Sequence, residues 1–121
     1  MTPAKFRKLA LALPEAVESS HMGHPDFRVG GKIFATLSGP GHRRAMVKLT
    51  EDQQHALTRS MPDVFTAVPG GWGRQGATYV GLPKADAAAV SDALQMAWRN
   101  TAPKKLLSLH PTTRRGRKTR K

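Results

Sequence analysis

A tryptophan among closely spaced glycines is the feature that most constrains the fold of this chain. Residues 70–78 read Gly-Gly-Trp-Gly-Arg-Gln-Gly-Ala-Thr, so four glycines lie within seven positions. Glycine loses more backbone freedom on folding than any other residue, and such a cluster therefore indicates positive φ angles or a close approach of two backbone segments. Residues 77–82 then alternate as a β-strand does. We expect a strand entered through a tight loop, with Trp72 and Arg74 at the rim of that loop.

Two interpretations of Trp72 follow from this placement. A flat aromatic ring beside a guanidinium group suits stacking on a nucleobase or binding of a phosphate. In a small domain, however, a tryptophan more often packs in the core or acts as a wedge between elements. The sequence alone leaves both interpretations open.

The remaining patterns predict an α+β domain, with a mostly antiparallel sheet and helices packed on one of its faces. Thr2-Pro3 is a typical helix start, and Thr50 with Gln53 forms a capping box at the start of another helix. The pair Gly30-Gly31 predicts a hairpin turn. The expected helices cover residues 3–12, 50–60 and 86–100, and the expected strands cover residues 17–22, 27–37 (two strands), 44–49, 64–68 and 77–82. We assign Phe6 and Trp98 to the core because both lie on apolar helical stripes.

Catalytic and metal-binding motifs receive little support from the sequence. Cysteine is absent, which excludes thiol catalysis, zinc–thiolate sites and disulfide bonds. His21, His24 and Asp26 lie close together, but residues three apart on one strand point to opposite faces, so we interpret this segment as a turn. Neither a nucleophile elbow nor a phosphate-binding loop is present. The sequence therefore predicts a binding protein rather than an enzyme, without a metal or another cofactor.

The positive charge is concentrated at the C-terminal end. The formal net charge is +12, and residues 103–121 hold eight Lys or Arg and no acidic residue, whereas residues 1–102 hold twelve basic and eight acidic residues. We therefore divide the chain into a domain of residues 1–102 and a basic tail of residues 103–121, which we expect to be disordered. Such a tail either keeps the protein in solution or binds a polyanion. The longest apolar run is too short to cross a bilayer, and we expect a cytoplasmic protein without a membrane partner.

Several motifs resemble those of the MmcQ/YjbR family. They are Ala-Leu-Ala-Leu-Pro-Glu at residues 10–15, His21 six residues before Phe27, the segment 27–35, the Trp-Gly-Arg-Gln-Gly-Ala-Thr run at residues 72–78, and Ala-Trp-Arg-Asn at residues 97–100. The resemblance covers about residues 5–107. It implies an α-β(3)-α-β(2)-α order, similar to frataxin-like or secretion-chaperone-like domains. It also implies DNA binding through a double-wing motif, but no catalytic residue or cofactor.

We therefore expect a nucleic-acid-binding protein, with DNA as the partner, that acts through contacts with the phosphate backbone. Cations on the hairpins would form wings beside the phosphates, and the tail would follow a groove. The expected binding residues are Arg28, Lys32, Arg43, Arg44, Trp72, Arg74, Lys104, Lys105, Arg114, Arg115, Arg117, Lys118, Arg120 and Lys121. The alternative is a small protein- or peptide-binding module, with Trp72 and Tyr79 as anchors. No small-molecule substrate is indicated, and we expect a monomer or a weak homodimer.

Overall fold

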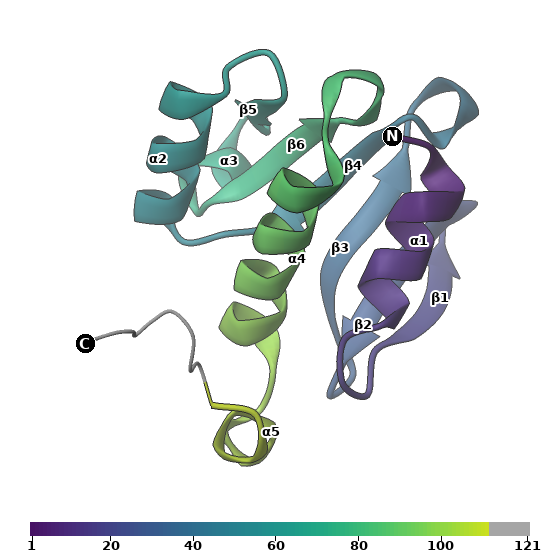
Figure 1. Ribbon diagram of the computed structural model, residues 1–121, viewed down its shortest axis with the longest axis vertical. Helices are drawn as coiled ribbons and strands as arrows, with labels where there is room; N and C mark the ends of the chain where they lie inside the picture. The colour runs from purple at the N-terminus through teal and green to yellow at the C-terminus, as the bar shows by residue number, and fades with distance from the viewer. Residues whose placement is uncertain (112–121) are drawn as a thin grey trace.

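A six-stranded antiparallel sheet organises the computed structural model, which describes residues 1–111 (Figure 1). Its spatial order is β1-β2-β3-β4-β6-β5, so each of the first three strands pairs with the next strand along the chain, whereas β4 pairs with β6. The strands are β1 (Val17–His21), β2 (His24–Val29), β3 (Lys32–Ser38), β4 (Arg44–Lys48), β5 (Phe65–Ala67) and β6 (Ala77–Gly81). The predicted α+β class with an antiparallel sheet is confirmed.

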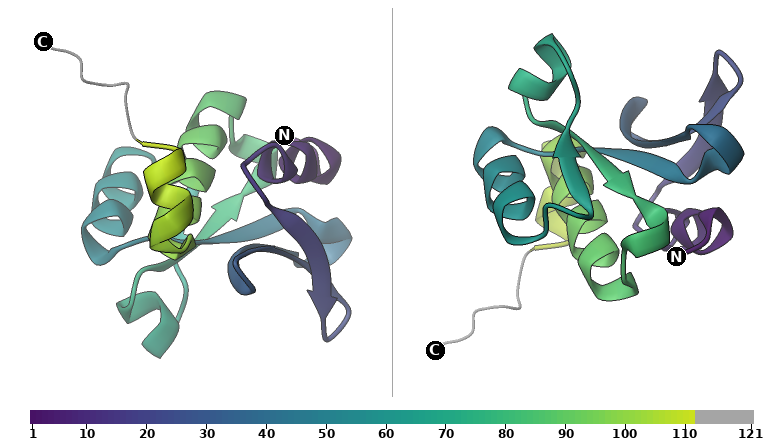
Figure 2. Two further views of the ribbon diagram at one scale, coloured as in Figure 1. Left: turned by 90° about the horizontal axis from the view of Figure 1, so that it is seen from below. Right: turned by 90° about the horizontal axis from the view of Figure 1, so that it is seen from above.

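The longer helices lie on one side of this sheet. The helices are α1 (Pro3–Leu11), α2 (Glu51–Ser60), α3 (Gly71–Arg74), α4 (Ala87–Thr101) and α5 (Lys104–Leu109), with 3₁₀ turns η1 (Pro40–His42) and η2 (Leu82–Lys84). Helices α1 and α4 cover the same face of the sheet, whereas α3 and the β1–β2 hairpin project toward the opposite side (Figure 2). Within the described residues, none of the helices has the length and apolar character needed to span a bilayer.

The core fills the space between the sheet and the helices α1 and α4. Phe6 of α1 and Phe27 of β2 have no exposed surface, and their rings meet edge to face with centroids 5.9 Å apart. Trp98 of α4 is 3% exposed, and its indole Nε1 donates a hydrogen bond to the Pro14 carbonyl at 2.9 Å. The predicted core positions of Phe6 and Trp98 are confirmed. Burial of these aromatic rings supplies much of the hydrophobic stabilisation.

Local capping signals fix the helix starts as expected. The Thr50 hydroxyl accepts a hydrogen bond from the Gln53 N–H, and the Gln53 side chain accepts one from the Thr50 N–H, which completes the capping box. Asp86 accepts from the Ala89 N–H at the start of α4. Gly30 and Gly31 both have positive φ, as a tight hairpin turn between β2 and β3 requires.

The structure corrects three expectations about the elements. Four strands precede α2, as the residue patterns predicted, whereas the family resemblance implied three; residues 17–21 form the edge strand and pair with β2. A single helical turn, α3, replaces the expected loop before β6. Disorder from residue 103 onward is wrong for Lys104–Leu109, which form α5. Leu106 is only 7% exposed and packs into the core, so its apolar side chain outweighs the local charge. The expectation of disorder at residues 112–121 lies outside the described residues.

Candidate nucleic-acid interface on the open sheet face

The face of the sheet opposite α1 and α4 is the candidate site, and we call it the open face. On β4, Ala45 and Val47 have no exposed surface and point toward the helices, so the alternation of a strand places Met46 and Lys48 on the open face. Residues that pair across neighbouring strands share a face, so Thr36 on β3 and Tyr79 on β6, which both pair with Met46, also lie on the open face. The β1–β2 hairpin and α3 project on this side of the sheet (Figure 2). The open face is therefore flanked by two projections.

A pocket of about 530 Å³ lies on this face. This volume falls within the range of roughly 300–1,000 Å³ that is typical of small-ligand sites. Its lining residues are His21, Ile33, Thr36, Met46, Lys48, Leu49, Trp72, Gln75, Ala77, Asn100 and Thr101. Ile33 of β3, Met46 of β4 and Ala77 of β6 supply apolar contact surface, and Thr36 and Lys48 add polar groups from the same strands. His21 from the β1 end and Trp72 from α3 contribute walls that come from distant parts of the sequence.

Trp72 is 71% exposed, so its interpretation as a core residue is wrong. The turn that carries it is nevertheless firmly anchored. Gln54 of α2 is 4% exposed, and its Nε2 donates hydrogen bonds of 2.9 Å to the carbonyls of both Gly73 and Ala77. Buried polar groups that are satisfied in this way hold neighbouring segments in one arrangement. Helix α3 therefore presents a large exposed aromatic ring on a fixed support.

Close backbone contacts explain two of the glycines near Trp72. A Cβ atom at Gly73 would lie 1.6 Å from the Val68 carbonyl oxygen, and one at Gly76 would lie 1.9 Å from the Leu49 carbonyl oxygen. Gly76 also has a φ of +109°, which other residues rarely adopt. Glycine is thus required at these two positions, because the backbone around α3 packs directly against the residue after β5 and against the β4–α2 junction. The expectation of positive φ or close approach in this segment is confirmed.

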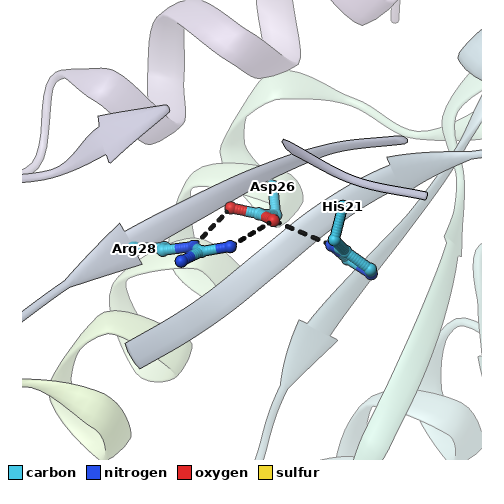
Figure 3. Close-up of polar contacts among 3 residues, drawn as sticks. All are labelled: His21, Asp26 and Arg28. Atoms are coloured by element: carbon cyan, nitrogen blue, oxygen red, sulfur yellow. Dashed lines mark hydrogen bonds and ion pairs between the residues drawn. The ribbon is translucent and has the colours of Figure 1, made fainter. Parts of the chain in front are cut away.

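His21, which lines the pocket, forms an ionic cluster with Asp26 and Arg28 (Figure 3). The Asp26 carboxylate has no exposed surface and accepts hydrogen bonds from Arg28 Nε at 2.8 Å and Arg28 Nη2 at 3.0 Å. His21 Nδ1 lies 2.8 Å from Asp26 Oδ2, the oxygen that also accepts from Arg28 Nη2. The Arg28 hydrogen bond holds the pKa of Asp26 below its ordinary value, against the opposing effect of burial, and His21 adds to this lowering. The paired carboxylate correspondingly raises the pKa of Arg28.

Sequence reasoning missed this cluster because it misplaced the turn. Met22 and Gly23 form the turn, with φ values of 51° and 80°, and His21 faces His24 across the hairpin. The two histidines are thus strand ends rather than turn residues. The spacing of Asp26 and Arg28, two apart on one strand, was the available signal that their side chains share a face. Within residues 1–111, no three His, Asp or Glu side chains gather in a way that could hold a metal ion.

The expected binding cations do not form one rim. Lys32 begins β3 and Arg43 follows its far end, so about 20 Å separates them at a rise of roughly 3.3 Å per residue. Arg44 lies over the Tyr79 ring, with its guanidinium carbon 4.1 Å from the ring centroid. Arg74 is exposed on α3. Lys104 and Lys105 are exposed on α5, while Arg114, Arg115, Arg117, Lys118, Arg120 and Lys121 lie outside the described residues.

The carboxylates of the sheet are already paired with cations. The six strands hold two acidic residues, of which Glu18 accepts from Arg7 of α1 at 2.8 Å and Asp26 is paired with Arg28. Among the described residues, Arg44, Lys48 and Arg74 have no ion-pair partner. Of these three cations, Lys48 lines the pocket with Trp72, Arg74 is on the same helical turn as Trp72, and Arg44 is at the other end of β4.

The fold and this face define a small α+β domain whose sheet is covered by helices on one side and open on the other. A family model named YjbR matches residues 11–100, and the chain belongs to the YjbR family. The fold is similar to the crystal structure of Deinococcus radiodurans protein DR2400, which has a DUF419 domain. The TM-score is 0.68 and the identity 16%, with 93% of this chain and 83% of that chain covered. No curated protein matches the sequence.

Proposed function

We propose that this protein binds DNA through the phosphate backbone, with the open face as the docking surface. The observation that carries the proposal is the charge distribution on that face. Arg44, Lys48 and Arg74 lack carboxylate partners among the described residues, whereas the buried Asp26 is neutralised by Arg28. A surface of this kind attracts polyanions and releases their condensed counterions on binding.

The shape of the face supports the same proposal. The β1–β2 hairpin and α3 project on the same side of the sheet (Figure 2), and His21 and Trp72 from these two projections line one pocket, which offers a place for part of a nucleic-acid strand. Arg44 is held against the Tyr79 ring, which restricts its guanidinium without consuming its charge. The sequence adds six further Lys or Arg at residues 112–121, and these increase the attraction for phosphate at longer range.

A protein or peptide ligand is the second candidate. Met46, Val68 and Ala77 form a small apolar cluster under the open face, with Tyr79 packed against it. Apolar anchors beside arginines are typical of protein interfaces. An apolar partner would bind with little dependence on salt, whereas phosphate contacts make the affinity fall steeply with salt. Salt dependence therefore separates the two candidates.

The test measures the affinity for a DNA duplex between about 50 and 200 mM salt. Each neutralised phosphate contributes about 0.9 to the slope of log affinity against log salt, so the double variant Lys48→Gln, Arg74→Gln should flatten the slope by up to about 1.8. Removal of residues 112–121 deletes six cations and should flatten it by up to about 5.

The control is the double variant Lys5→Gln, Arg59→Gln, which removes the same charge from exposed sites on α1 and α2. We expect its salt slope to stay close to that of the unmodified protein, because neither side chain lies on the open face. An affinity that does not change with salt, or an equal loss in both double variants, would contradict the proposal.

A further inference from the structure

We infer that the pocket beside Trp72 binds one unstacked nucleobase, so that the open face prefers single-stranded to double-stranded nucleic acid. This inference rests on the proposed function and names the part of the ligand that enters the pocket. A base in a duplex is stacked on both faces and cannot reach a pocket, whereas a single strand can turn a base outward. The pocket, with a volume of about 530 Å³, is large enough for a small planar ligand.

The walls and floor of the pocket suit the flat face of a base. Trp72 is 71% exposed and also lines the pocket, so its ring is available for stacking. Gln54 anchors the turn that carries Trp72, and little conformational entropy is lost when a ligand packs against it. Ile33, Met46 and Ala77 supply apolar contact on the floor. Stacking on aromatic side chains is the main way in which single strands are bound without sequence preference.

Polar atoms at the pocket are placed for the edges of a base. His21 uses Nδ1 for the Asp26 contact, so its second ring nitrogen has no partner among the described residues. Asn100 donates through Nδ2 to the Lys48 carbonyl and to Gln53, and its side-chain oxygen keeps its capacity to accept. Both residues line the pocket. These groups can donate to or accept from an unpaired base, as recognition of single strands requires.

Charge selects a nucleotide over a neutral aromatic ligand. The Lys48 side chain lines the pocket and has no ion-pair partner within residues 1–111. Among the described residues that line the pocket there is no carboxylate, and the Asp26 carboxylate that contacts His21 is also paired with Arg28. A base on Trp72 would therefore carry its phosphate toward a cation rather than toward an uncompensated anion.

The test compares two oligomers of about twelve nucleotides, oligothymidylate and its abasic counterpart, which has the same phosphates but no bases. Affinities are measured for the full chain by fluorescence anisotropy of labelled oligomers. Stacking of one base is worth about 1–3 kcal/mol, so the thymidylate should bind about 5- to 150-fold more tightly than the abasic strand. Trp72→Ala should abolish this ratio and leave the affinity for the abasic strand unchanged. Trp72→Phe should retain part of it.

Leu109→Ala is the control, because Leu109 is also an exposed large apolar residue, 65% exposed, but lies on α5. It should leave the ratio intact. Equal binding of both oligomers by the unmodified protein would overturn the base pocket and leave backbone binding standing. Binding of neither oligomer by a protein that still binds the duplex would overturn the base pocket alone, and a failure to bind the duplex as well would overturn the proposed function. Competition by oligoglutamate as strong as that by oligothymidylate would also overturn the base pocket and indicate an acidic peptide instead.

Discussion

Replacement of Gln54 by methionine tests whether a buried amide supports the open face. Methionine has nearly the shape of glutamine but cannot donate to the carbonyls of Gly73 and Ala77, each of which receives a 2.9 Å hydrogen bond. A hydrogen bond contributes about 0.5–1.5 kcal/mol net, so two of them predict a loss of about 1–3 kcal/mol in the free energy of unfolding. The loss would be greater if both carbonyls stay buried without a partner.

Urea unfolding followed by circular dichroism measures this loss. With a slope of about 2 kcal/mol per molar, a loss of 2 kcal/mol lowers the midpoint by about 1 M. The chain should remain folded without denaturant, because domains of this size are stable by about 5–15 kcal/mol. Since α3 loses its anchor, the affinity ratio between oligothymidylate and the abasic strand should also fall, although Trp72 itself is unchanged.

Gln95→Met is the matched control. Gln95 is an exposed glutamine on α4, and its side chain makes a single 3.4 Å hydrogen bond, to Ser91. An exposed substitution of this kind changes stability by less than about 0.5 kcal/mol. If Gln54→Met costs no more than Gln95→Met, the argument that the buried amide fixes α3 is refuted. A stability loss without any change in the affinity ratio would refute the link between this anchor and the pocket.

Two further predictions concern stability. Gly76→Ala should cost about 2–6 kcal/mol by thermal or urea unfolding, since its Cβ would lie 1.9 Å from the Leu49 carbonyl oxygen and its φ is +109°. Gly31→Ala, with a φ of +80° but open space around it, should cost only about 1–2 kcal/mol, and equal losses would contradict the close-contact explanation. Asp26→Asn should cost about 1–3 kcal/mol at neutral pH. Because folding lowers the pKa of Asp26 from its ordinary value of 3.8, its stabilising contribution is complete above that value and is lost as the pH falls below it. The two proteins should therefore converge in stability at low pH, and a difference that persists there would show that the ion pair with Arg28 is not its cause.

Short-range signals in the sequence predicted most of the secondary structure. The capping residues Thr50, Gln53 and Asp86 and the Gly30-Gly31 pair act on backbone groups within a few residues. The helix starts and the hairpin turn that they specify can therefore be predicted without the tertiary structure. Such local signals did not predict the structure of the segment after residue 102. Its charge predicted disorder, but Leu106 finds an apolar surface on the folded domain, and the sequence gives no sign of that surface.

The candidate site depended on contacts between distant residues. The glycine cluster indicated that the backbone has positive φ angles or close contacts in this segment. Only the fold shows that the close contacts are with the carbonyl groups of Val68 and Leu49. Likewise, Trp72 and Gln54 are eighteen positions apart in the sequence. No local pattern predicts that the Gln54 amide donates a hydrogen bond to the turn that carries the exposed Trp72 ring.

The sequence by itself determined the α+β class, the helix starts, the hairpin turn and the excess of positive charge. These properties follow from composition and from interactions within a few residues. Only the tertiary structure decided that Trp72 is exposed, that the carboxylate of Asp26 is neutralised, and that Lys48 lies in the same pocket as both His21 and Trp72. The physical reason is that exposure and charge pairing depend on which strands become neighbours, and strand order is set by packing across the whole sheet.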